Sequence, residues 1–157
     1  MNTVELLQTS VGFAFDVLGM VTTDLTQEQA DWQPPKKANS ITANYWHVIA
    51  YVDFILQKVL KPCDDSLFQG DPPSEICMQE VQVELSELHH RAGEVRKDFL
   101  DWLSSLTPAD LDVEMNTSVG PLNVGQVVEI WGSWHINVHC GEISAIKGLQ
   151  GATGYPW

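Results

Sequence analysis

The chain has 157 residues, of which 44% are hydrophobic and 18% are charged, as is typical of one globular domain with a single core. Its 8 Lys and Arg residues against 21 Asp and Glu residues give a formal net charge of −13. Such a surface repels nucleic-acid phosphates and anionic lipid, so the charge disfavours nucleic-acid and membrane partners, although it also serves plain solubility.

Four segments carry apolar residues at alternating steps of three and four, the period of an amphipathic helix. The first predicted helix covers roughly residues 3–22 and needs a partner to bury its apolar stripe. That stripe consists of Val4, Leu7, Val11, Ala14, Leu18, Val21 and Leu25. A long connection over residues 24–39 follows, because it contains Pro34-Pro35 and turn formers.

The second predicted helix begins near Ser40 or Thr42, since either side chain can cap the free amides of a first turn. Pro62 ends it. The segment between them is apolar nearly all round, which indicates deep burial. Its stripe consists of Ile41, Tyr45, Val48, Val52, Ile55 and Val59.

The third predicted helix has the longest stripe, begins after Ser74 as its cap and runs to about residue 105. The stripe consists of Met78, Val81, Leu85, Leu88, Ala92, Val95, Phe99, Trp102 and Leu106. A connection through Gly120-Pro121 leads to the fourth helix, which covers residues 124–149. No strand-like alternation competes with these helices. We therefore expect an all-α four-helix bundle forming a single domain over residues 1–157, with long connections that leave the topology open.

Three histidines in the second and fourth helices form the strongest functional signal. His135 and His139 lie four residues apart on the apolar face, so both imidazoles can reach one point. His47 lies in an almost wholly apolar helix, where a free imidazole needs a partner. Each histidine alone is also explained as a core residue bonded to the backbone or to Tyr51. Together they predict a metal site with three ligands.

Neutral imidazoles suit zinc or nickel, and also iron or cobalt, better than magnesium or calcium. Three protein ligands leave open coordination positions, which is the arrangement of a catalytic rather than a closed structural site. An ion held there can lower the pKa of a bound water or thiol and so generate a nucleophile near neutral pH.

The other two histidines, His89 and His90, are expected to be surface residues, because His90 lies among charged side chains. Cys140 follows His139 directly and points about 100° away from it on an ideal helix, so we do not expect it to be a ligand or nucleophile. Glu142 lies one turn beyond His139 and is a candidate to orient a ligand or act as a base, or is a solvated or interfacial carboxylate. Four aromatic residues either wall an apolar pocket or, as their spacing favours, pack in the core: Trp46, Tyr51, Trp131 and Trp134.

Two stretches carry a family resemblance. WHINVHCGEISAIKGLQG resembles the last helix of the DinB/YfiT-like superfamily, in which H-x-x-x-H is followed by a small residue, Gln or Glu, and a closing Leu-x-Gly. ADWQPPKKANSITANYWHVIAYVD is similar to that family's loop and second helix. The resemblance covers essentially the whole chain and implies that His47, His135 and His139 are the metal ligands. It also implies a four-helix bundle with up-down-down-up topology, often a homodimer.

Relatives in this family include metal-dependent transferases and isomerases that use low-molecular-weight thiols. A thiol-dependent S-transferase acting on a small electrophile is therefore our first hypothesis, although few cationic side chains are available to hold a polyanionic cosubstrate. Three alternatives stay open: a metal-dependent hydrolase, a non-catalytic metal-binding or stress-associated bundle, and a helical interaction protein with buried histidines and no metal.

The cysteines and the start of the chain bear on the compartment. Cys63, Cys77 and Cys140 are odd in number and show no C-x-x-C spacing, which argues against a disulfide framework or thiolate zinc site and favours a reducing compartment. The opening MNTVELLQTS lacks a cationic segment followed by an apolar run, and no stretch is expected to have the length of a membrane span. We expect cytoplasmic residence.

Overall fold

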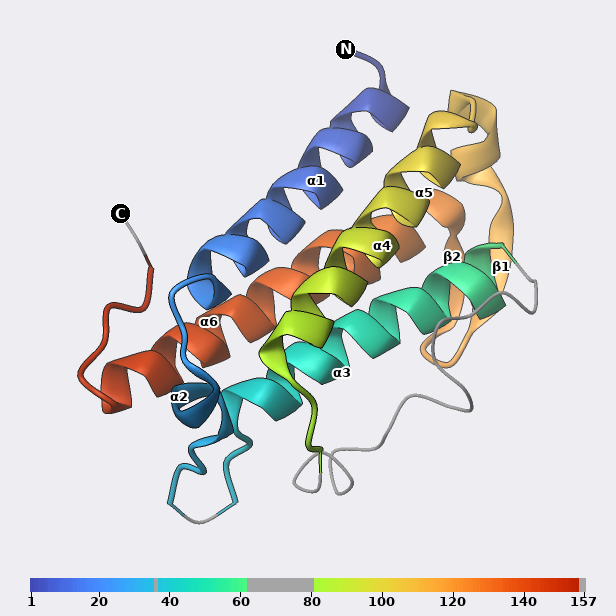
Figure 1. The fold of residues 1–157 in the computed structure, drawn as a ribbon. Coiled ribbons are helices and arrows are strands. Elements are labelled where there is room, and N and C mark those ends of the chain that lie inside the picture. The colour runs from blue at the N-terminus through green and yellow to red at the C-terminus, as the bar shows by residue number, and fades with distance from the viewer. Residues whose placement is uncertain (36, 62–80, 156–157) are drawn as a thin grey trace.

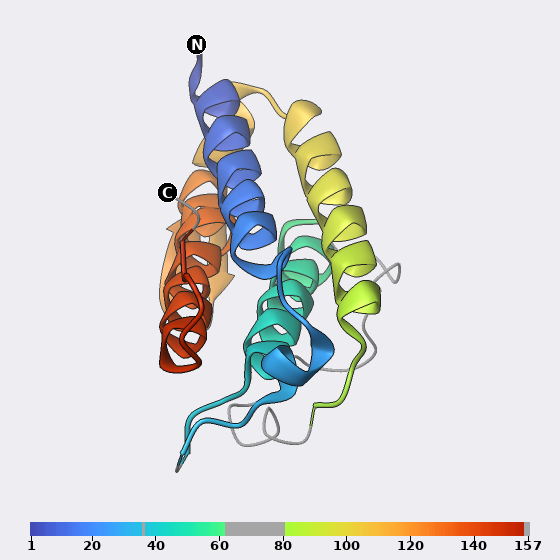
Figure 2. The ribbon, with the colours of Figure 1, turned by 60° about the vertical axis from the view of Figure 1, so that its left-hand side comes forward.

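A computed structural model describes residues 1–35, 37–61 and 81–155. The described chain is mostly helical, as expected. Its helical elements are α1 (Thr3–Thr22), α2 (Gln27–Asp31), α3 (Ile41–Phe54), η1 (Ile55–Leu60), α4 (Leu85–Ser104), η3 (Pro108–Asp112), α5 (Val124–Val127), η4 (Val128–Trp134) and α6 (His135–Leu149). The segments η1 and η4 are π-helical, so α3–η1 and α5–η4–α6 are continuous rods. These rods pack side by side with α1 and α4 (Figures 1 and 2).

The first helix starts where the predicted one does. Asn2 and Glu5 form a reciprocal capping box at its N-terminus, and its buried face packs against α4 and α6. By length and composition α1 could cross a membrane, which contradicts the expectation that no stretch has that length. This is weak evidence for a span, because the core helix of a soluble protein meets the same criteria.

The second predicted helix begins at the Ser40 cap, one of the two residues expected there. The Ala43 amide donates to Ser40 Oγ at 3.1 Å, which satisfies a first-turn donor. Val48 and Ile49 are fully buried in the main core. Pro62, the predicted end, lies outside the described residues, and helical structure continues to Leu60.

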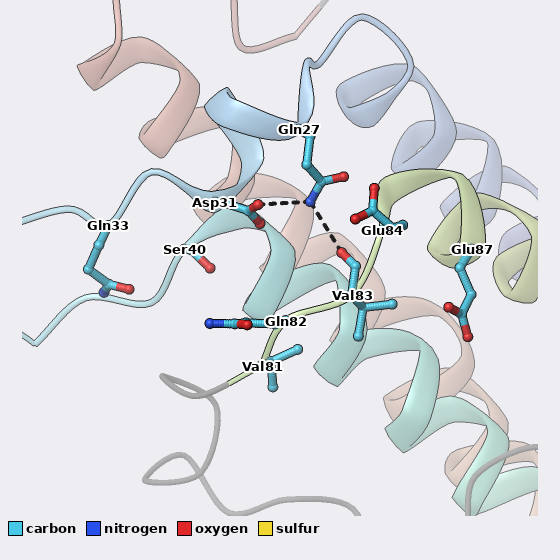
Figure 3. A pocket seen from close by; sticks show the side chains of 9 residues that line it. All are labelled: Gln27, Asp31, Gln33, Ser40, Val81, Gln82, Val83, Glu84 and Glu87. Atoms are coloured by element: carbon cyan, nitrogen blue, oxygen red, sulfur yellow. Dashed lines mark hydrogen bonds between the residues drawn. The ribbon is translucent and has the colours of Figure 1, made fainter.

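The start of α4 corrects the third predicted helix. Residues 81–84 are not helical, and the helix begins at Leu85. Gln27 from α2 explains this boundary: its Oε1 accepts the Leu85 amide at 2.8 Å, and its Nε2 donates to Asp31 Oδ2 and to the Val83 carbonyl (Figure 3). A remote side chain therefore supplies the cap. Ser74, the expected cap, lies outside the described residues.

A β-hairpin corrects the expectation that the chain has no strands. Strand β1 (Glu114–Thr117) pairs antiparallel with β2 (Gly120–Asn123), and Met115 lies opposite Leu122. Gly120 has φ of 112°, a conformation that favours glycine at the turn. Each strand has four residues, too few for a clear alternation of apolar and polar residues in the sequence.

Candidate metal centre

The packing of α3 against α6 brings the three predicted ligands together. His47 lies in the middle of α3, whereas His135 is the first residue of α6 and His139 lies one turn later. The ring centroids are 5.3 Å apart for His47 and His135, 4.9 Å for His47 and His139, and 4.6 Å for His135 and His139. One nitrogen from each ring lies within 4.8 Å of the others. The geometry fits a shared ion.

Two buried ring nitrogens at this place carry no hydrogen bond. His47 Nδ1 and His135 Nε2 have no partner among the residues that the structure describes. A buried, unsatisfied polar atom costs about 1–3 kcal/mol, so such atoms are uncommon in a core. A divalent ion is the natural partner for neutral imidazole nitrogens that converge in this way. The donor set therefore fits a transition metal.

The environment keeps the rings of His47 and His135 neutral. Burial, followed by repulsion from His139, lowers the pKa of His47 to about 4 and the pKa of His135 to about 3. Both rings consequently hold a free lone pair at neutral pH. Metal binding requires this state, because a protonated imidazole cannot act as a ligand.

Glu142 orients the third imidazole. Its Oε2 lies 2.6 Å from His139 Nδ1, and the hydrogen bond from His139 is the largest cause of its lowered pKa. When Nδ1–H donates to the carboxylate, the lone pair of the ring is on Nε2. Glu142 is thus placed as the residue that sets the tautomer of His139, the first of its three predicted roles.

The predicted aromatic residues divide into two groups. The Tyr51 ring lies 5.6 Å from the His47 ring and 5.1 Å from the His135 ring, and Trp131 is buried one turn before His135. Trp134, in contrast, is 60% exposed, and Trp46 packs against the main core. No hydrogen bond joins Tyr51 to a histidine in the described part of the chain. The alternative in which the buried histidines are hydrogen-bonded to Tyr51 is therefore not supported.

Sequence reasoning missed the environment of His89. Its Nδ1 lies 3.1 Å from the hydroxyl of Tyr45, a residue only 1% exposed, and burial lowers the pKa of His89. Its position beside the core residue Leu88 was the available signal. His90 is exposed as predicted, and Cys140 is fully buried in the main core. Neither His90 nor Cys140 belongs to the candidate metal centre.

The π-helical segments beside the histidines were also missed. Segment η4 ends directly before His135, and η1 follows α3 two turns beyond His47. A π-helical turn inserts an extra residue, costs stability and is frequent at functional sites. The pattern of apolar residues does not predict these π-helical segments, because the three-four spacing of an ordinary helix continues through both of them.

Comparison with known proteins gives one finding. A family model described as the DinB superfamily matches residues 14–143, a span that contains all three histidines and Glu142. A search of curated proteins gives no match.

Proposed function

Because the chain belongs to the DinB superfamily, we propose that it is a metal-dependent enzyme whose ligands are His47, His135 and His139. One observation carries the proposal: three imidazoles converge, and two of their buried nitrogens have no other partner. Three ligands leave coordination positions for a reactant, as in catalytic rather than structural sites. Zinc or nickel suits this donor set first, with iron or cobalt as the next candidates.

The reaction that we propose is S-transfer from a low-molecular-weight thiol to a small electrophile. The thiol loses its proton, its sulfur electron pair forms a bond to the electrophilic carbon, and the bond from that carbon to the leaving group breaks with its electron pair. A divalent ion would supply the positive charge that favours the thiolate at neutral pH. Neutral His47 and His135 leave that charge uncancelled.

The remaining residues of the centre have supporting roles. Glu142 accepts the Nδ1 proton of His139 and holds that ring in one orientation. Tyr51 lies against two of the imidazoles. A thiol fits this environment better than a polyanionic cosubstrate, because the chain has 8 Lys and Arg residues against 21 acids.

Elemental analysis and a thiol-transfer assay together test the function. Protein purified without an affinity tag should contain close to one equivalent of transition metal, and should consume a thiol and a model electrophile such as an epoxide. His135→Ala should lose both properties while remaining folded. His90→Ala, a change at an exposed histidine, is the matched control and should retain both. Metal below a tenth of an equivalent, without stabilisation on metal titration, refutes the site.

Activity separates the enzyme from the non-catalytic alternative. A protein that binds one equivalent of metal yet turns over no thiol in a panel of thiols and electrophiles is a metal-binding bundle. Hydrolysis of an ester without thiol consumption would instead assign the centre to a hydrolase.

We also propose that the protein is a homodimer. Leu6, Phe13 and Met20 are exposed large apolar residues seven positions apart, so they form one stripe on the outer face of α1. A stripe of this kind is self-complementary when a second copy meets it across a two-fold axis. The up-down-down-up topology is proposed as well. In Figures 1 and 2, α1 and the α5–η4–α6 rod run in one direction and α3 and α4 in the other, which supports it.

A further inference from the structure

A second apolar cluster adjoins the histidines, and two of its partly buried members, Leu60 and Met115, also pack against the main core. Its buried members are Ile55, Val127 and Trp131. Around them lie partly buried apolar side chains that include Tyr51, Met115 and Leu122. We call this set the hairpin cluster, because Met115 and Leu122 come from the two strands. Figure 1 shows the hairpin beside the end of α3 and the start of the α5–η4–α6 rod.

Tyr51 joins the hairpin cluster to the metal centre. Its ring lies against the imidazoles of His47 and His135, and its side chain also packs against the buried members of the cluster. Trp131 lies one turn before His135 on the same rod and is only 8% exposed. The cluster and the imidazoles therefore share Tyr51 as a common neighbour.

Both π-helical segments contribute to this cluster. Ile55 is the first residue of η1, and Trp131 lies in the middle of η4. A π-helical turn is less stable than an α-helical turn and persists where a site requires the altered register. One rod carries such a segment directly before His135 and the other carries one two turns beyond His47, and residues of both segments meet in the cluster. This coincidence points to a binding site and not to packing alone.

The cluster presents aromatic and aliphatic side chains, whereas the chain as a whole carries a net charge of −13. Met115 and Leu122 are opposite each other in the hairpin register, and both pack against the cluster. Partly buried apolar surface of this kind gains free energy when an apolar group covers it. A phosphate, carboxylate or ammonium group would lose its hydration there without a compensating partner.

We propose that the hairpin cluster binds the substrate's apolar part, a neutral aromatic or branched aliphatic group attached to the electrophilic atom. This inference rests on the proposed function and adds the substrate class to it. Met115 and Leu122 would then determine specificity without contacting the metal.

A pair of metal-directed probes tests the proposal. Imidazole and 4-phenylimidazole both present a ligand nitrogen, but only the second carries an apolar group. Each is titrated into cobalt-loaded protein and followed by the visible absorption of the cobalt ion. We expect 4-phenylimidazole to bind about tenfold more tightly, since filling an apolar subsite gives discrimination of this order.

Three hairpin variants assign the difference in affinity to the cluster. In M115Q/L122Q the advantage of 4-phenylimidazole should fall to about twofold, while imidazole binding is unchanged. Val119→Gln is the matched control, because Val119 is an apolar residue of the same hairpin that is 69% exposed. It should keep the full advantage. Leu122→Ala alone should give an intermediate loss, and it replaces the double variant if circular dichroism shows that the latter is unfolded.

The outcomes separate this proposal from the proposed function. Equal affinities for the two probes, or an advantage that survives the hairpin substitutions, overturn the hairpin cluster as a subsite even when cobalt binds. If cobalt does not bind, the metal function fails. Calorimetric titration of 4-phenylimidazole into metal-free protein then decides the subsite, with binding lost in M115Q/L122Q supporting it and no binding by the native chain overturning it.

Discussion

Glu142 offers the sharpest quantitative test of the metal centre. Its carboxylate lies 2.6 Å from His139 Nδ1, so the substitution Glu142→Ala removes the acceptor that fixes the tautomer and orientation of this predicted ligand. Loss of such a partner usually lowers metal affinity by about 10–100-fold. The Glu142 side chain is 50% exposed, and solvent screens its charge, so the lower limit applies. We expect about a tenfold loss, equivalent to about 1.4 kcal/mol.

A second substitution separates the hydrogen bond from the charge. Glu142→Gln retains an oxygen that can accept the Nδ1 proton but removes the negative charge. We expect about a threefold loss of affinity, or about 0.7 kcal/mol, because the orientation of His139 survives. Glu129→Gln makes the same chemical change at an exposed position of the same rod and should have no effect.

Competition for zinc with a chromophoric chelator at neutral pH measures these affinities. Thermal unfolding of the metal-free variants checks that each is folded. A Glu142→Ala protein that binds zinc within twofold of the native chain would refute the positioning role. A loss equally large in Glu129→Gln would show that the effect is one of general charge.

Three further predictions follow from the structure. In metal-free protein the unfolded chain protonates His47 and His135 near the ordinary value of 6.5, whereas the folded pKa values are about 4 and 3. The unfolded state thus binds more protons between these values. The free energy of unfolding should therefore fall as pH decreases from 6.5 to 4, by up to about 1.4 kcal/mol per pH unit for each ring. A free energy of unfolding, measured with urea, that stays constant over this pH range would contradict this. Gly132→Ala places a Cβ 2.9 Å from Phe99 Cζ and 3.1 Å from Val11 Cγ2, so thermal unfolding should show a destabilisation of about 1–3 kcal/mol. Gly141→Ala, whose Cβ has ordinary contact at 3.9 Å, is its control and should not destabilise. Phe13→Glu adds charge to the apolar stripe of α1, so in sedimentation equilibrium this variant should be a monomer where the native protein is a dimer. A native protein that sediments as a monomer would exclude the dimer.

Local patterns in the chain predicted most of the helical structure. The apolar stripe of α1 and the burial of Phe99 follow from short-range spacing, which a helix converts directly into one buried face, and the cap of α3 is one of the two residues expected there. The α4 boundary did not follow, because its cap is Gln27, which lies 58 residues before Leu85 in the chain. The hairpin was missed since its strands are too short to carry a period. Homodimerisation and cytoplasmic residence stay predictions.

For the candidate metal centre as well, the sequence predicted some features and the tertiary structure decided the others. The sequence by itself determined that His135 and His139 share one helical face, since residues four apart must do so on any helix. It also marked His47 as an imidazole in apolar surroundings that needs a partner. Only the tertiary structure decided that these two helices pack with all three rings in reach of one point, and that Tyr51 and the hairpin cluster adjoin them. That outcome depends on contacts between distant segments, and helical periodicity carries no information about which faces meet.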